Sequence, residues 1–95
     1  MERREYDISI VFNGVRIKKV IIDPHFEKKH SDSINDEIIL QLVKLLDGEI
    51  FEPREENPPF SYFAEELTFN EKLYRLVWLL EDNQIYIGVV NAYRR

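Results

Sequence analysis

The two histidines are the residues of this sequence best suited to acid–base chemistry near neutral pH. His25 and His30 both lie in the segment DPHFEKKHS. Histidine has an unperturbed pKa close to neutrality, so it can accept and release a proton without help from its surroundings. His30 is the better candidate because it immediately precedes a predicted helix, and backbone N–H groups at a helix N-terminus can receive a phosphate. The alternative is that both histidines are ordinary exposed loop residues.

The same segment also contains side chains of metal-ligating type: Asp23, His25, Glu27 and His30. Their spacing matches neither H-E-x-x-H nor a histidine pair at i, i+4 on a helix. Lys28 and Lys29 lie among them and would repel a cation. We therefore expect neither a metal nor a cofactor at this segment.

Arg75 is the second group that could do chemistry, because it interrupts the apolar run YRLVWLL. A charge in such a run needs a partner if it is buried. One interpretation is an ion pair at the rim of the sheet, with Glu37 or Glu81. The other is a phosphate clamp, since a guanidinium group can bind phosphate oxygens bidentately. The sequence leaves both open.

Charge is unevenly distributed along the chain. The 13 Lys and Arg against 18 Asp and Glu give a net charge of −5, which argues against a protein that coats nucleic acid through bulk charge. Residues 16–30 are nevertheless net positive, whereas residues 47–56 are strongly acidic. This pattern suits a short anionic ligand bound at one end of the sheet, and a solvated strand face with a charged tail is the alternative. If that ligand is RNA, the candidate RNA-binding residues are Lys18, Lys19, Lys28 and Lys29.

The aromatic residues allow two interpretations. Phe60, Tyr62, Phe63 and Phe69 could stack on bases. A small domain also needs bulky side chains to fill its core, so we expect most aromatic residues to be buried.

An N-terminal hairpin over residues 1–23 and one helix are the first elements expected to position these groups. Alternation in YDISIVFN predicts a half-buried strand, and Asn13-Gly14 predicts a type I′ turn. In the returning strand Val15 and Ile17 are expected to point inward, and a phase slip at Lys18-Lys19 indicates a bulge. A helix is predicted over 33–47, with Ser33 as its N-cap and Gly48 as its stop.

The last third of the chain predicts a C-terminal meander over residues 60–93. EIFE is a possible short strand before it, and the proline-rich acidic segment PREENPP is expected to be a loop. KLYRLVWLL and IYIGVVNAY are β-rich runs joined by a tight connection. The result is one α+β domain over residues 1–95, of ββαβββ order, with an antiparallel sheet packed on one main helix.

Composition excludes several other classes. With no cysteine, the chain has no disulfide, no thiol nucleophile and no cysteine zinc site. The charged start MERREYD is not a signal peptide, and the longest nearly apolar stretch, IILQLVKLL, is far shorter than the ~20 residues that span a bilayer. We therefore expect a cytoplasmic protein without a membrane segment.

Residues 25–95 resemble the small RelE/ParE-like toxins of the barnase–colicin–RelE group of metal-independent ribonucleases. The resemblance is carried by His30 and the helix after it, by Tyr74-Arg75-Leu76-Val77, and by the ending IGVVNAYRR. It implies RNA cleavage in which the ribose 2′-hydroxyl attacks the adjacent phosphate, and a cognate antitoxin as partner. The resemblance makes His30 the acid–base group, Tyr93 a second proton donor, and Arg75 with Arg94 the phosphate clamp. The chain departs from the family in its acidic charge, its N-terminal hairpin and its lack of a dense basic cluster on the sheet.

Two other hypotheses stand beside the ribonuclease. In one, the chain is a non-enzymatic protein-interaction module, whose open sheet edge or acidic PREENPP loop docks another protein. In the other, it is a degenerate nuclease fold kept only for binding. In the first of these hypotheses, the histidines are incidental.

Overall fold

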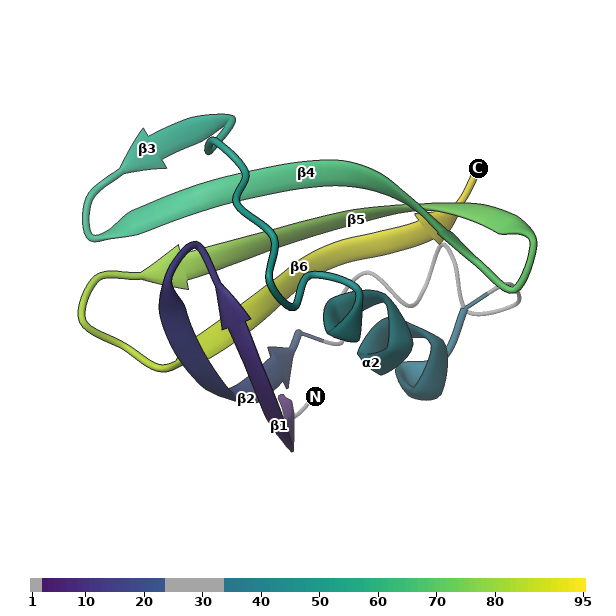
Figure 1. The fold of residues 1–95 in the computed structure, drawn as a ribbon, viewed down its shortest axis with the longest axis horizontal. Helices are drawn as coiled ribbons and strands as arrows, with labels where there is room; N and C mark the ends of the chain where they lie inside the picture. Colours follow the sequence, from purple (N-terminus) through teal and green to yellow (C-terminus); the bar gives the residue numbers. More distant parts are fainter. Residues whose placement is uncertain (1–2, 24–33) are drawn as a thin grey trace.

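The computed structural model describes residues 3–23 and 34–95 (Figure 1). Strands hold 59% of these residues and form one curled, mixed sheet. The strands run in the order β1-β2-β6-β5-β4-β3 across the sheet. The elements are β1 (Arg4–Phe12), β2 (Val15–Ile22), α2 (Asp36–Lys44), β3 (Glu55–Asn57), β4 (Phe60–Phe69), β5 (Lys72–Glu81) and β6 (Tyr86–Arg94).

The N-terminal hairpin has the turn that its sequence predicts. Asn13 and Gly14 both have positive φ, at 51° and 75°. The irregularity predicted at Lys18-Lys19 is present, because the N–H groups of both lysines donate to the Ile85 carbonyl, at 2.8 and 3.3 Å. Toward β1 the extra residue lies in β1 instead, since Asp7 to Ile10 faces the shorter stretch from Ile17 to Lys19. Val15 was expected to point inward but is exposed.

The prediction of an antiparallel sheet is wrong. β2 pairs in parallel with β6, from Lys19 opposite Tyr86 to Ile22 opposite Val89, and the other neighbouring strands are antiparallel. The physical reason is that alternation in a sequence shows which face of a strand is buried, but not which strand lies next to it or in which direction.

The helix is shorter than predicted. α2 has nine residues, about 13 Å at the usual rise, so it cannot cover the sheet. Its N-cap is Asn35, whose side chain accepts the Ile38 N–H at 2.9 Å, whereas the predicted cap Ser33 lies outside the described residues. Its buried residues are Ile39, Leu42 and Val43. An α+β fold with a main helix on the sheet is therefore also wrong, and the fold is a curled half-barrel that is mostly sheet.

The sheet curls because the rings inside it make contact across several strands. Phe12 of β1 lies 5.2 Å from Phe63 of β4 and 5.5 Å from Trp78 of β5, between ring centroids. In the strand order, β1 and β4 are four spacings apart, about 19 Å in a flat sheet. Side chains on one face of a flat sheet could not meet over that distance. The interior is therefore filled mainly by the sheet itself, with α2 closing one side (Figure 1).

The free edge of β1 is covered where the hairpin turns. The Gly48 N–H donates to the Val11 carbonyl at 2.7 Å, and the Asn13 N–H donates to the Glu49 carbonyl at 3.0 Å. The Asn13 side chain also accepts from the Phe51 N–H and donates to its carbonyl, at 2.8 and 2.9 Å. The segment after α2 is thus held along β1, and it forms no strand at EIFE. A short strand instead occupies Glu55–Asn57, within the predicted loop.

Shortening Phe12 should unfold the protein more readily than any change on the exposed side of the same strand. We expect Phe12→Ala to lower the free energy of unfolding by about 3–5 kcal/mol, because it leaves a cavity between Trp78 and Phe63. Val11→Thr is the matched control, since Val11 is 42% exposed, and it should change stability by about 0.5 kcal/mol or less. Urea unfolding measures both. Equal losses for the two variants would show that the aromatic contact does not hold the curl.

Candidate functional site

The sheet has a second face, opposite α2, that is only half-covered. Along β5, Tyr74, Leu76 and Trp78 are buried in the core that α2 shares. Alternate residues of the strand therefore point the other way. We call this side the outer face. It is made by Ile21 of β2, by Phe60, Tyr62, Ala64 and Glu66 of β4, by Arg75, Val77, Leu79 and Glu81 of β5, and by Tyr86, Gly88, Asn91 and Tyr93 of β6.

Gly88 makes a hollow in the middle of the outer face. It lies between Ile21 of β2 and Leu79 of β5 in the strand register. A Cβ atom built on Gly88 would lie 2.9 Å from Leu79 Cδ1, so the Leu79 side chain occupies space that a larger residue would need. A glycine inside a strand often marks such a close approach.

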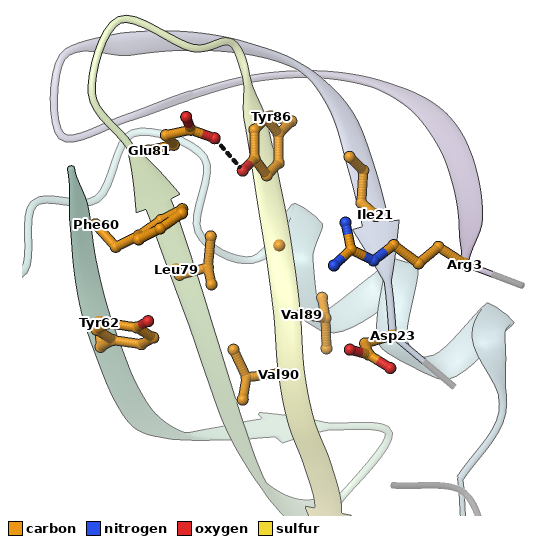
Figure 2. Close-up of a pocket in the computed structure, with 11 residues that line it drawn as sticks. Arg3, Ile21, Asp23, Phe60, Tyr62, Leu79, Glu81, Tyr86, Val89 and Val90 are labelled. Atoms are coloured by element: carbon orange, nitrogen blue, oxygen red, sulfur yellow. Dashed lines mark hydrogen bonds between the residues drawn. The ribbon is translucent and has the colours of Figure 1, made fainter. Parts of the chain in front are cut away.

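A pocket of about 370 Å³ lies over this hollow (Figure 2). Its base is apolar and is lined by Ile21, Leu79, Gly88, Val89 and Val90. Three aromatic residues form its walls: Phe60, Tyr62 and Tyr86. Three charged residues stand at its rim: Arg3, Asp23 and Glu81. An apolar base with aromatic walls and a few polar groups is the usual character of a binding site.

Tyr86 and Glu81 form the one hydrogen bond drawn inside the pocket (Figure 2). The Tyr86 hydroxyl donates to Glu81 Oε1 at 2.6 Å. Burial, and then the hydrogen bond and charge of Glu81, raise the pKa of Tyr86 to about 12. The phenol is therefore neutral at physiological pH, and the Glu81 carboxylate gives this end of the outer face a negative charge.

The opposite end of the outer face is basic. Arg75 lies opposite Glu66 of β4 and Tyr93 of β6. Glu66 forms an ion pair with Arg95, whose Nε lies 2.8 Å from Glu66 Oε2. No residue that the structure describes forms a hydrogen bond or ion pair with Arg75. Arg75 is six residues from Glu81 on the same strand, about 20 Å away. Along β5, the outer face thus has an acidic residue at one end, apolar residues in the middle and a basic residue at the other end. Charges of the opposite sign also lie at both ends, as Arg3 near Glu81 and as Glu66 beside Arg75.

The structure brings together two of the residues that the toxin resemblance implies. Arg75 and Tyr93 are direct neighbours across β5 and β6 on the outer face. Arg94 pairs with the core-facing Tyr74, so it lies on the other side of the sheet. The ion pair of Arg75 with Glu37 or Glu81, the alternative interpretation of its sequence, does not occur among the described residues.

The structure separates the predicted RNA-binding lysines from Arg75. Lys18 and Lys19 are exposed at the hairpin bulge. Lys19 pairs with Tyr86 in the register, which places it at the acidic end of the outer face, and its ammonium group lies 3.8 Å from Glu5. His30, Lys28 and Lys29 lie outside the described residues.

The pocket is not predicted from the sequence. The expectation that most aromatic residues are buried in the core included Phe60 and Tyr62, which instead form walls of the pocket. The available signal was a glycine inside the β-rich run YIGVV, preceded at two residues by a tyrosine. That signal indicates a close approach, but it does not identify Leu79 or Phe60 as the neighbours across the sheet.

Neither a metal centre nor a membrane span occurs in the part of the chain that the structure describes. No three His, Cys, Asp or Glu side chains converge there in a way that could hold a metal ion. Of the candidate metal ligands, His25, Glu27 and His30 lie outside this part. No helix within it is long and apolar enough to cross a bilayer.

Comparison with known proteins gives no relative for this chain. No family model, no curated protein and no solved structure matches it. The likeness to RelE/ParE-like toxins therefore rests on the residues quoted for it, and the function has to be argued from the outer face.

Tyr86 should ionise at a higher pH than an unperturbed tyrosine. Because its folded-state pKa of about 12 lies above the unfolded value of about 10, its contribution to stability is complete below pH ~10 and is lost as the pH rises through ~12. Tyr86→Phe should remove one late step from the tyrosinate absorbance titration and reduce the alkaline loss of stability. Tyr6→Phe is the control, since Asp36 also raises the pKa of Tyr6 away from the pocket. An unchanged titration in Tyr86→Phe would contradict the Tyr86–Glu81 contact.

Proposed function

We propose that this protein is a non-enzymatic interaction module that docks a protein partner on its outer face. The observation that carries the proposal is the half-exposed row of apolar and aromatic residues with a hollow over Gly88. Protein interfaces concentrate their binding energy in such sites, where one anchor side chain fills a pocket. The pocket is also lined by Tyr62, Tyr86 and Arg3, and tyrosine and arginine are residue types that are enriched at protein interfaces.

The outer face is a better docking surface than either edge of the sheet. The edge at β1 is already hydrogen-bonded to the segment around Gly48 and Phe51. The edge at β3 is three residues long, and two of them are the exposed Glu55 and Glu56. Short, charged edge strands resist the addition of another strand. Among the residues that the structure describes, none protects the face opposite α2 in this way.

The pocket indicates what the partner presents there. Its apolar base accepts the methyl or methylene groups of a side chain, and its aromatic walls add ring contacts. Glu81 has one carboxylate oxygen engaged by Tyr86, so it can still accept a hydrogen bond or pair with a cation at the rim. An aliphatic or aromatic anchor flanked by a basic group is the chemistry that fits.

Site-specific photo-crosslinking tests this proposal. A photoreactive amino acid at Val90, on the pocket lining, should give discrete protein adducts in an extract of the native cell. Adding Gly88→Val should suppress them, since the new side chain would displace the Leu79 side chain, which lines the pocket. The matched control places the same group at Lys44, an exposed residue of α2 on the other side of the sheet. Identical adducts from both positions, or none from Val90, would overturn the proposal.

RNA cleavage of the RelE type is a second candidate, favoured by one observation. Arg75 and Tyr93 lie side by side on the outer face, where a guanidinium and a phenol could bind and protonate a phosphate. RNA as substrate, an antitoxin as partner and a cytoplasmic location belong to this candidate.

Incubation of the purified protein with total RNA in EDTA tests the ribonuclease candidate. We expect cleavage that survives chelation, because the mechanism needs no metal, and that is lost in His30→Ala and Arg75→Ala. Arg54→Ala is the control, since Arg54 is exposed in the segment before β3. Intact RNA after incubation with the wild-type protein would rule the activity out.

A further inference from the structure

We propose that the outer face docks a second copy of this chain, with β5 of one copy antiparallel to β5 of the other. The inference rests on the proposed function and identifies its partner. Two properties of the outer face support it: the charges at the two ends of β5 and the sizes of the side chains between them. The charge pattern that other partners would need supports it as well.

The charges of the outer face are complementary to themselves. Glu81 and Arg75 lie on the same side of β5, with Trp78 midway between them. A two-fold axis that crosses β5 at Trp78, between two stacked sheets, would place Glu81 of each copy over Arg75 of the other. The contact would form twice. It uses an arginine that has no ion pair among the described residues and a glutamate with one oxygen engaged.

The side chains between these charges alternate in size in the way that stacked sheets need. Residues that lie opposite one another on neighbouring strands form a row across the sheet. The same axis places the row through Leu79, which includes the bulky Tyr62 and the hollow at Gly88, over the partner's row through Val77. The row through Val77 includes the small Ala64. Tyr62 of one copy would thus lie over Ala64 of the other, so large residues meet small ones across the ~10 Å between sheets.

The pattern favours a second copy over a protein of one dominant charge. A basic partner surface would pair with Glu81 but would oppose Arg75, and an acidic surface would do the reverse. A second copy turned by 180° satisfies both ends at once. Phe60, Tyr62, Leu79 and Val90, which Figure 2 shows projecting from the same side of the sheet, would then be covered together.

Charge reversal combined with mixing tests the inference. Sedimentation velocity should show a wild-type dimer, and Arg75→Glu and Glu81→Arg should each raise its dissociation constant at least ~10-fold, since each change places like charges together twice. An equimolar mixture of the two variants should dimerise again, because the carboxylates of the Arg75→Glu chain then face the guanidinium groups of the Glu81→Arg chain at both contacts. Circular dichroism checks that each variant is folded. Arg54→Glu, at an exposed residue outside the outer face, is the control and should leave the dimer unchanged.

The sedimentation and crosslinking results together distinguish failure of the self-pairing from failure of the proposed function. A wild-type monomer at all concentrations, or a dimer insensitive to both reversals, would overturn the inference. If the Val90 crosslink then joins a different protein, the proposed function stands without the self-pairing. If Val90 gives no adduct, the proposed function fails as well. An adduct of twice the chain mass, lost together with the dimer in Arg75→Glu, would support both.

Discussion

The contact of Phe12 with Trp78 is the constraint on which the rest of the structure depends. It joins the first strand of the sheet to the fourth in the strand order, and Phe63 contacts both rings, stacking on Trp78 with its ring 9° from parallel. These rings fill much of the interior, so α2, with its nine residues, needs to close only one side. The contact also has a cost. Trp78 Nε1 is buried and has no hydrogen-bond partner among the described residues, a loss of about 1–3 kcal/mol that the packing of the rings must exceed.

Curling also determines which residues remain for function. Since the core uses one side of β5, Leu79 and Glu81 are left on the other side, away from α2. The start of β1 is held by a bidentate ion pair from Arg4 to Asp36 of α2, which also accepts the Tyr6 hydroxyl. The Arg4 contact keeps the pKa of Asp36 below its usual value, so this tie persists at neutral pH. By holding Arg4 against the helix, it leaves Arg3 at the rim of the pocket.

The sequence predicted local structure well and the arrangement of elements poorly. The Asn13-Gly14 turn, the irregularity at Lys18-Lys19 and the two last strands follow from backbone requirements and period-two alternation, which are local properties. The parallel pairing of β2 with β6 depends on contacts between residues almost 70 positions apart, and alternation does not encode it. The outer face was missed for the same reason. Arg75 stands out in its own strand, but Gly88 and Leu79 do not, and only the register brings these two together.

The net charge of −5 bears on association more than on nucleic acid. Acidic residues lie on the exposed β3 edge, as Glu55 and Glu56, so two copies brought together along that edge would place like charges side by side. The outer face has the opposite arrangement, because Arg75 and Glu81 lie at its two ends with apolar residues between them. The distribution of charge therefore disfavours growth of the sheet through its edge and permits association through the face. This difference between edge and face matters for a sheet with one buried and one half-exposed face. Pairing through an edge can add further strands without limit, whereas pairing of two outer faces gives a closed dimer.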